Sequence, residues 1–262
     1  MAISKSIIIQ LCIRLTQFFS KPLARIHTYA VKAGIVNIPD CICNAPGGMN
    51  KNLQKIWNAR LLKKAVSVLV RSPLRLKTIQ LINLAFLLPV HSGSVIVTCH
   101  TPWKRLIVQW LSENKYGILI DSGESAKRAK YFRTKRNNYN EFLGIVRHLR
   151  NGGHIIIAAD VFDQSTNCPA CIMGKYGNLS LLPARLARLA DVPMITVIPA
   201  LRNGSIQLAE GVRLNMKISE SDTIPVMQKF LAHFENEIKT DPSVWSYFVN
   251  DPLRKFKHKL II

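Results

Sequence analysis

The chain has 262 residues, of which 48% are hydrophobic and 19% are charged. This composition excludes a disordered chain and is sufficient for one domain with a sizeable core. Its 36 lysines and arginines outnumber 15 aspartates and glutamates, and the net charge of +21 indicates phosphate-rich or acidic partners. Because the charge is spread along the chain without a nucleic-acid recognition motif, we expect an anionic membrane surface and not nucleic acid.

Residues 1–90 are predicted to form a helical N-terminal region. Its first apolar side chains recur at near-helical spacing: Ile3, Ile7, Leu11, Leu15 and Phe18. Cations are interspersed among them: Lys5, Arg14, Lys21 and Arg25. Such a helix either lies in a membrane interface, with its cations at the lipid phosphates, or packs on the folded domain. Both interpretations stay open at this point.

No segment of this region is predicted to cross a bilayer. The uncharged run at residues 6–13 is far shorter than the about 20 residues that a spanning helix needs. A second apolar stretch, at residues 78–90, is also too short and indicates a buried helix. No small-residue cleavage site follows the first run, so we do not expect a secretory signal.

From residue 94 onward, short apolar runs rich in β-branched residues alternate with helical patterns. Strands are expected at residues 94–99, 117–121, 154–160 and 192–200. Helices are expected at residues 102–113, 138–151, 179–190 and 224–239. Apolar strands separated by helices indicate an α/β fold with a mixed, largely parallel central sheet flanked by helices. We expect this α/β domain to cover residues 91–262 and to continue from the helical region without a break.

Three polar side chains fall at the carboxyl ends of the predicted strands: His100, Asp121 and Asp160. Ligands of parallel sheets bind at this edge, so these residues mark the expected site. His100 can accept a proton from an attacking hydroxyl or amine, or it is only a hydrogen-bonded polar residue. Asp160 needs partners because an unpaired buried charge is costly. It would bind a cationic group or accept N–H bonds from the next loop.

Two other features were weighed as binding sites. The basic segment at residues 126–138 contains six lysines and arginines, and it either binds an anion or forms a solvated face. Two cysteine pairs, at positions 41 and 43 and at 168 and 171, would supply four zinc ligands, but the first pair lacks the usual spacing. We therefore expect reduced thiols and no metal. Cys12 and Cys99 lie in apolar runs and are expected in the core.

Several segments share their order and spacing with a known family. They are YFRTKRNN (131–138), GGHIIIAADVFDQ (152–164), CIMGKYGNLSLLPARLARLADVPMITVIPAL (171–201) and DPSVWSYFVNDPLRKFK (241–257). Together they resemble the lysophospholipid acyltransferase superfamily, and within it most closely the lipid A biosynthesis lauroyl/myristoyl acyltransferases. The likeness covers residues 94–257.

The resemblance implies a glycerolipid-acyltransferase-like fold and the transfer of a fatty acyl group. The donor would be an acyl-carrier-protein or coenzyme A thioester, and the acceptor a hydroxyl or amine of a lipid-like molecule. His100 takes the place of the general base of the family. The substrate-binding residues carried over are Arg133, Asp160, Gly174 and Arg185. The thioester is a co-substrate, and no separate cofactor is implied.

One position departs from the family pattern. The acid that should follow the histidine by five residues is replaced by Arg105. Four other carboxylates are candidates to support the base: Asp121, Glu124, Asp160 and Asp163. Alternatively, the acceptor is an intrinsically nucleophilic amine, or the protein is catalytically degenerate and binds lipid or acyl groups without turnover.

The resemblance and the charge together predict where the protein works. We expect it at the cytoplasmic face of the inner (cell) membrane, held there peripherally or by its N-terminus. Its expected partners are anionic membrane lipid and the acyl thioester, because a basic surface suits both lipid phosphates and an acidic carrier protein.

Overall fold

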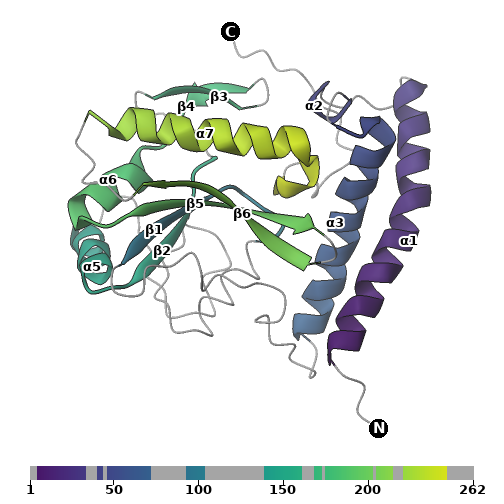
Figure 1. The fold of residues 1–262 in the computed structure, drawn as a ribbon, viewed down its shortest axis with the longest axis horizontal. Coiled ribbons are helices and arrows are strands. Elements are labelled where there is room, and N and C mark those ends of the chain that lie inside the picture. The colour runs from purple at the N-terminus through teal and green to yellow at the C-terminus, as the bar shows by residue number, and fades with distance from the viewer. Residues whose placement is uncertain are drawn as a thin grey trace.

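The computed structural model of the protein describes residues 5–33, 40–43, 46–71, 93–103, 139–160, 168–172, 175–202, 205–214 and 221–246. A four-stranded sheet lies at its centre, and helix α7 (Thr223–Thr240) runs along one face of it (Figure 1). Helices α5 (Tyr139–Arg150) and α6 (Leu182–Ala190) lie at one end of the sheet. The pair α1 (Lys5–Lys32) and α3 (Gly48–Arg71) lies at the other end.

The sheet confirms the predicted fold class. Its strands are β1 (Ser94–Thr98), β2 (His154–Ala158), β5 (Met194–Arg202) and β6 (Ser205–Leu214), in the spatial order β2-β1-β5-β6. β1 runs parallel to both β2 and β5, and β6 returns antiparallel to β5. The described part is thus α/β, with a mixed, largely parallel sheet. Every residue of β1 is buried, as in a central strand that is covered on both faces.

Five predicted elements lie within two residues of their expected ends, one helix starts later than expected, and strand β6 and the two strands of a small hairpin were not predicted. Strands β1, β2 and β5 and helices α5 and α7 lie where they were predicted. Helix α6 begins at Leu182, later than the predicted start at residue 179, because Leu179 still pairs its N–H with the Cys168 carbonyl. Pro183 then occupies the first turn of α6, where its missing N–H costs nothing.

Helix α5 ends at the predicted pair of glycines. Gly152 has a φ of 83°, in the left-handed region, and its N–H donates to the Leu149 carbonyl. Gly153 lies so close to the His148 ring that any Cβ there would collide with it. The chain can therefore turn directly from α5 into β2.

Three predicted segments lie partly or wholly outside the described residues. The strand expected at 117–121 and the apolar stretch at 78–90 are outside them altogether. Only residues 102 and 103 of the helix expected at 102–113 are described, and they form a turn.

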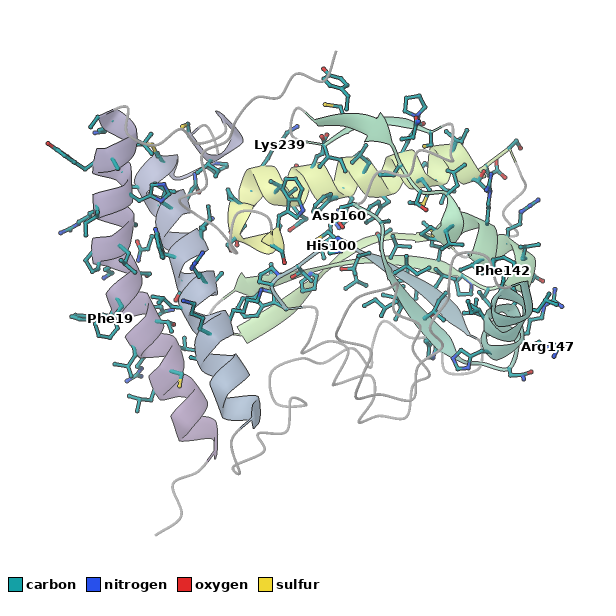
Figure 2. The ribbon with its side chains drawn as sticks, turned by 180° about the vertical axis from the view of Figure 1, so that it is seen from behind. Phe19, His100, Phe142, Arg147, Asp160 and Lys239 are labelled. Atoms are coloured by element: carbon teal, nitrogen blue, oxygen red, sulfur yellow. The ribbon has the colours of Figure 1, made fainter. Side chains whose placement is uncertain are left out.

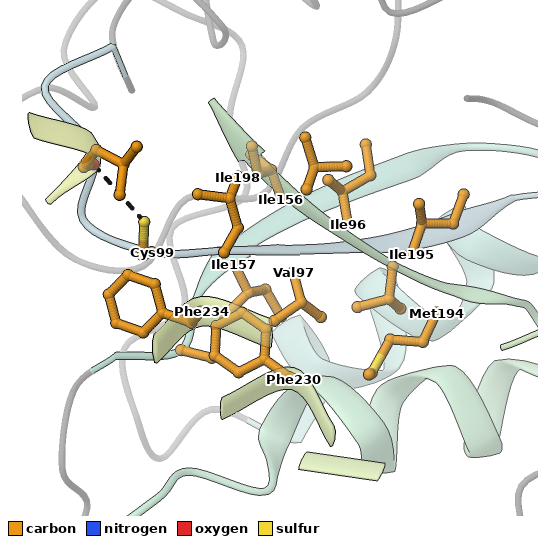
Figure 3. Close-up of a cluster of buried hydrophobic side chains, with 14 of the residues drawn as sticks. Ile96, Val97, Cys99, Ile156, Ile157, Met194, Ile195, Ile198, Phe230 and Phe234 are labelled. Atoms are coloured by element: carbon orange, nitrogen blue, oxygen red, sulfur yellow. Dashed lines mark hydrogen bonds between the residues drawn. The ribbon is translucent and has the colours of Figure 1, made fainter. Parts of the chain in front are cut away.

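The core is formed where α7 packs on the parallel strands (Figure 3). Its buried α7 side chains recur at helical spacing: Val226, Met227, Phe230, Phe234 and Ile238. The rings of Phe230 and Phe234 stack with centroids 6.0 Å apart. Figure 3 shows the Phe230 ring next to Val97 of β1 and Ile157 of β2, and the Phe234 ring next to Cys99. A small hairpin, β3 (Pro169–Ile172) and β4 (Lys175–Asn178), lies beyond α7.

The N-terminal region, as far as the structure describes it (5–33, 40–43 and 46–71), is mainly helical. Helix α1 packs lengthwise against α3, and the short helix α2 (Asp40–Cys43) also contacts α3. The Lys55 ammonium of α3 donates to the Thr240 carbonyl at 3.1 Å, which joins this pair to the end of α7. No helix in the described ranges is long and apolar enough to cross a membrane.

Candidate active site

Strand register brings two polar side chains together at the carboxyl edge of the sheet. Thr98, the last residue of β1, pairs with Ala158, the last residue of β2. The Ala159 N–H then donates to the Thr98 carbonyl at 2.9 Å, so the pairing continues beyond the strand ends. His100 and Asp160 each follow by two residues, and Figure 2 shows them side by side. Ligands of parallel sheets bind at this edge.

His100 and Asp160 form a hydrogen-bonded dyad. His100 Nδ1 lies 2.7 Å from Asp160 Oδ1, and the same oxygen accepts the backbone N–H of His100 at 2.8 Å. An ionised carboxylate only accepts, so Nδ1 carries a hydrogen, and in a neutral imidazole Nε2 is then the nitrogen that can accept a proton. The Asp160 side chain is 2% exposed and the His100 side chain 44% exposed. The carboxylate therefore lies behind a ring that is open to an incoming reactant.

The closing segment, residues 241–246, holds both members of the dyad. Trp245 Nε1 donates to Asp160 Oδ2 at 2.8 Å, and the Ser246 N–H donates to the His100 carbonyl at 2.6 Å. Both carboxylate oxygens are thus hydrogen-bonded, which offsets the cost of burying the charge. The resemblance places Asp160 among the substrate-binding residues. The structure shows the Asp160 oxygens hydrogen-bonded to His100 and Trp245, and substrate binding by Asp160 stays a prediction.

Capping and packing fix the conformation of the closing segment. The 3₁₀ turn η3 (Pro242–Val244) is capped by Asp241, whose Oδ1 accepts the Ser243 N–H at 3.0 Å and the Ser243 hydroxyl at 2.7 Å. The Trp245 ring packs edge-to-face on Phe234 of α7, with centroids 5.7 Å apart. The indole N–H is therefore aimed at Asp160 before any reactant arrives.

Cys99, which directly precedes His100, is a core thiol, as predicted. Its side chain is fully buried, and its Sγ lies 4.0 Å from the Val244 carbonyl, the contact dashed in Figure 3. Burial, and secondarily the negative charge of Asp160, raise the pKa of this thiol well above its ordinary value. Only a thiolate is a strong nucleophile, so Cys99 is unsuited to covalent catalysis. Proton transfer at this edge falls to His100.

The other predicted site residues divide into two groups. Arg185 lies on α6 with its side chain exposed, and within the described residues it makes no hydrogen bond or ion pair with His100 or Asp160. The remaining ones lie outside the described residues: Arg105, Asp121, Glu124, Arg133, Asp163 and Gly174. Of the four candidate carboxylates, Asp160 is the one within the described residues, and it contacts His100.

Sequence reasoning assigned no role to Trp245 or Ser246. Trp245 is separated from Asp160 by 85 residues, and its contact depends on the length of α7 and on the turn at η3. The only available signal was that Trp245 matches the closing motif of the resembled family. In the described ranges, no group of three or more histidine, cysteine or acidic side chains is placed to hold a metal.

Comparison with known proteins adds no assignment to this geometry. No protein-family model matches the chain, and no curated protein matches its sequence. The acyltransferase resemblance therefore remains a prediction from the quoted segments.

We predict that Trp245→Phe weakens the dyad without disrupting the aromatic packing. Phenylalanine keeps the contact with Phe234 but leaves Asp160 Oδ2 buried without its donor, which should lower the free energy of unfolding by about 1–3 kcal/mol. Because Asp160 would also hold His100 less firmly, we expect kcat of any reaction at this site to fall about tenfold, with KM unchanged. Urea unfolding and steady-state kinetics measure the two effects.

Trp57→Phe is the matched control for this experiment. Trp57 lies on α3, and its Nε1 has no hydrogen-bond partner among the described residues. Replacing it therefore removes an indole N–H without breaking a hydrogen bond to the dyad. Equal losses of kcat in the two variants would contradict a specific role for Trp245.

Proposed function

We propose that the protein is an acyltransferase in which His100 is the general base and Asp160 orients it. The observation that carries this proposal is the 2.7 Å contact between His100 Nδ1 and a buried carboxylate, beside an exposed ring. A base that has lost its acid at position 105 would be left without support. Asp160 supplies a carboxylate at the place where an imidazolium would form.

The proposed chemistry is a direct acyl transfer. The acceptor hydroxyl or amine attacks the thioester carbonyl carbon while His100 Nε2 takes its proton. The tetrahedral intermediate then collapses, the C–S bond breaks, and the leaving sulfur takes the proton back from the imidazolium. Asp160 stays ionised throughout and stabilises the transient positive charge on the ring. No covalent acyl-enzyme is needed, in keeping with the raised pKa of Cys99.

The proposed reactants follow from the resemblance and from charge. A thioester of acyl carrier protein or coenzyme A is acidic, and the acceptor would be a lipid-like molecule at the cytoplasmic face of the inner membrane. A chain with a net charge of +21 would attract both of them electrostatically. Arg133 and Gly174 keep their proposed roles in substrate binding, and so does Arg185.

Mass spectrometry of acylated products tests the proposal. Lipid and metabolite extracts would be compared from cells that express the wild type, His100→Ala, or the control variant His233→Ala. His233 lies on α7 and is not part of the dyad. We expect an acylated product with the wild type and with His233→Ala, and its loss with His100→Ala. If the wild type, folded and supplied with acyl thioesters and lipid acceptors, forms no product, the protein is a binding protein and not an acyltransferase.

A further inference from the structure

Helix α1 turns its small side chains inward. The face that packs on α3 consists of Ile13, Thr16, Ser20, Ala24 and His27. These residues recur at three- and four-residue spacing and let the two helix backbones approach closely. Only one of the five is a large aliphatic residue. From residue 11 onward, the buried face of α1 is therefore less apolar than a face that packs on a protein core usually is.

From residue 11 onward, six large apolar side chains of α1 point outward. They are Leu11, Leu15, Phe18, Phe19, Ile26 and Tyr29, which we call the α1 outer face. With 3.6 residues per turn, they fall within an arc of about 100°. Phe18 is 69% exposed and Tyr29 73% exposed, and Figure 2 shows Phe19 pointing away from α3. Of the nine large hydrophobic side chains that are exposed in the described residues, six lie here, so the outer face is a concentrated patch and not scattered exposure.

Cations line one border of this patch. Arg14, Lys21 and Arg25 are exposed and lie on the same side of the apolar arc. The sequences of α1 and α3 contain five and six lysines and arginines respectively, and no aspartate or glutamate. The whole helix pair is thus a positively charged surface with an apolar stripe along its outer side.

We propose that the α1 outer face binds the surface of an anionic lipid bilayer, with the helix lying in the membrane plane. A bilayer interface offers hydrocarbon beside phosphate, which matches a stripe of leucine and phenylalanine beside arginine and lysine. Nucleic acid would pair with the cations but leave the aromatic stripe uncovered. A second copy of the chain would cover the stripe but would place no carboxylate opposite the cations, because α1 and α3 have none.

This surface is separate from the dyad. Helix α3 lies between α1 and the sheet that carries His100 (Figure 2). The inference therefore does not depend on acyl transfer, and it can be tested without turnover. If both proposals hold, α1 would keep the protein at the surface where its acceptor lies.

Vesicle flotation with the full chain tests the proposal. We expect the wild type to bind vesicles of equal parts phosphatidylcholine and phosphatidylglycerol, and to bind pure phosphatidylcholine at least tenfold more weakly. The double variant Phe18→Ser/Phe19→Ser should lower the partition coefficient at least tenfold on the mixed vesicles. The double variant Arg14→Glu/Arg25→Glu should remove the preference for phosphatidylglycerol. All four positions are exposed, so the thermal unfolding temperature should not change.

Two matched controls lie elsewhere on the surface. Tyr176→Ser/Leu189→Ser removes exposed apolar side chains from β4 and α6, and Arg147→Glu/Lys239→Glu reverses exposed charges on α5 and α7. Both controls should bind vesicles like the wild type. Wild-type protein that does not float, or outer-face variants that float no less than the controls, would overturn the proposal. Light scattering that shows a dimer which only Phe18→Ser/Phe19→Ser dissociates, without vesicle binding, would assign the face to a second copy instead.

Discussion

Replacing Asp160 with asparagine is expected to lower kcat for acyl transfer by about three to four orders of magnitude. The carboxylate fixes the tautomer of His100 and stabilises the imidazolium as it forms. An amide carries no charge and cannot provide the second function. Because the Asp160 side chain is buried behind the ring, KM should change little. Single-turnover kinetics with the acceptor found by mass spectrometry would measure the loss.

The hydrogen bonds of Asp160 make this substitution more severe than a loss of charge. Asp160 receives three N–H groups, two from His100 and one from Trp245. Asparagine has one acceptor oxygen and one NH₂ donor. If the amide oxygen faces His100, the NH₂ group faces the Trp245 N–H. If the amide is flipped, the NH₂ group faces the two N–H donors of His100. At least one buried N–H is left unpaired in either orientation.

This conflict predicts non-additive kinetics. In the Asp160→Asn background, Trp245→Phe removes the opposing N–H, so the second substitution should change kcat by less than threefold or raise it. In the wild-type background, Trp245→Phe should lower kcat about tenfold. Asp191→Asn is the control, because Asp191 is an exposed C-cap residue of α6 with a φ of 56°, which asparagine tolerates. Full activity of Asp160→Asn would exclude the dyad from the mechanism.

The protein is expected to lose about 3 kcal/mol of stability to the protonation of one histidine as the pH falls from 6.5 to 4. His154, at the start of β2, is buried, and its Nδ1 lies 2.8 Å from the Ser94 hydroxyl. Burial, and secondarily the nearby His148, lower the pKa of His154 from 6.5 to about 4. Between these two pH values, His154 is therefore protonated in the unfolded chain but mostly neutral in the folded chain. The stabilisation is complete above pH 6.5 and is lost as the pH falls towards 4.

Urea unfolding at several pH values, for the wild type and for His154→Asn, isolates this contribution. Asparagine places an acceptor near the position of Nδ1 and does not titrate. The variant should therefore be less stable than the wild type at pH 7.5, but its free energy of unfolding should fall less as the pH is lowered. The free energy of unfolding is plotted against pH for each protein. Subtracting one slope from the other removes the titration of the carboxylates, which is common to both proteins. Parallel slopes between pH 6.5 and 4 would show that His154 is not held neutral by the fold.

The three parallel strands and the flanking helices could be predicted because their residues carry strong local patterns, whereas the antiparallel strand β6 was not predicted. The apolar β-branched runs at β1, β2 and β5 fit only strands that are buried on both faces, and the two glycines after α5 allow an immediate turn. The start of α6 was misplaced because the pairing of Leu179 with Cys168 involves another part of the chain. Local pattern does not reveal such a contact.

The candidate site could be predicted only in part. His100 and Asp160 were each identified as strand-end residues, but four carboxylates competed as the partner of the histidine. Choosing among them requires the strand order, which places β2 next to β1 and sets Ala158 opposite Thr98. The contact with Trp245 depends on tertiary packing alone. On α1, the apolar spacing was visible in the sequence, but it did not show that the smaller residues would pack inward.

The hydrogen bonds of the closing segment impose an order of assembly on the site. His100 and Asp160 follow strands that are synthesised long before residues 241–246, yet Trp245 and Ser246 supply two of the bonds that hold them. A ribosome-bound chain that has emerged only as far as α7 would carry His100 and Asp160 without the hydrogen bonds from Trp245 and Ser246. The dyad can therefore reach its final geometry only after the closing segment has been synthesised and has packed against it. A late segment of the chain thus completes a site that begins at the ends of β1 and β2.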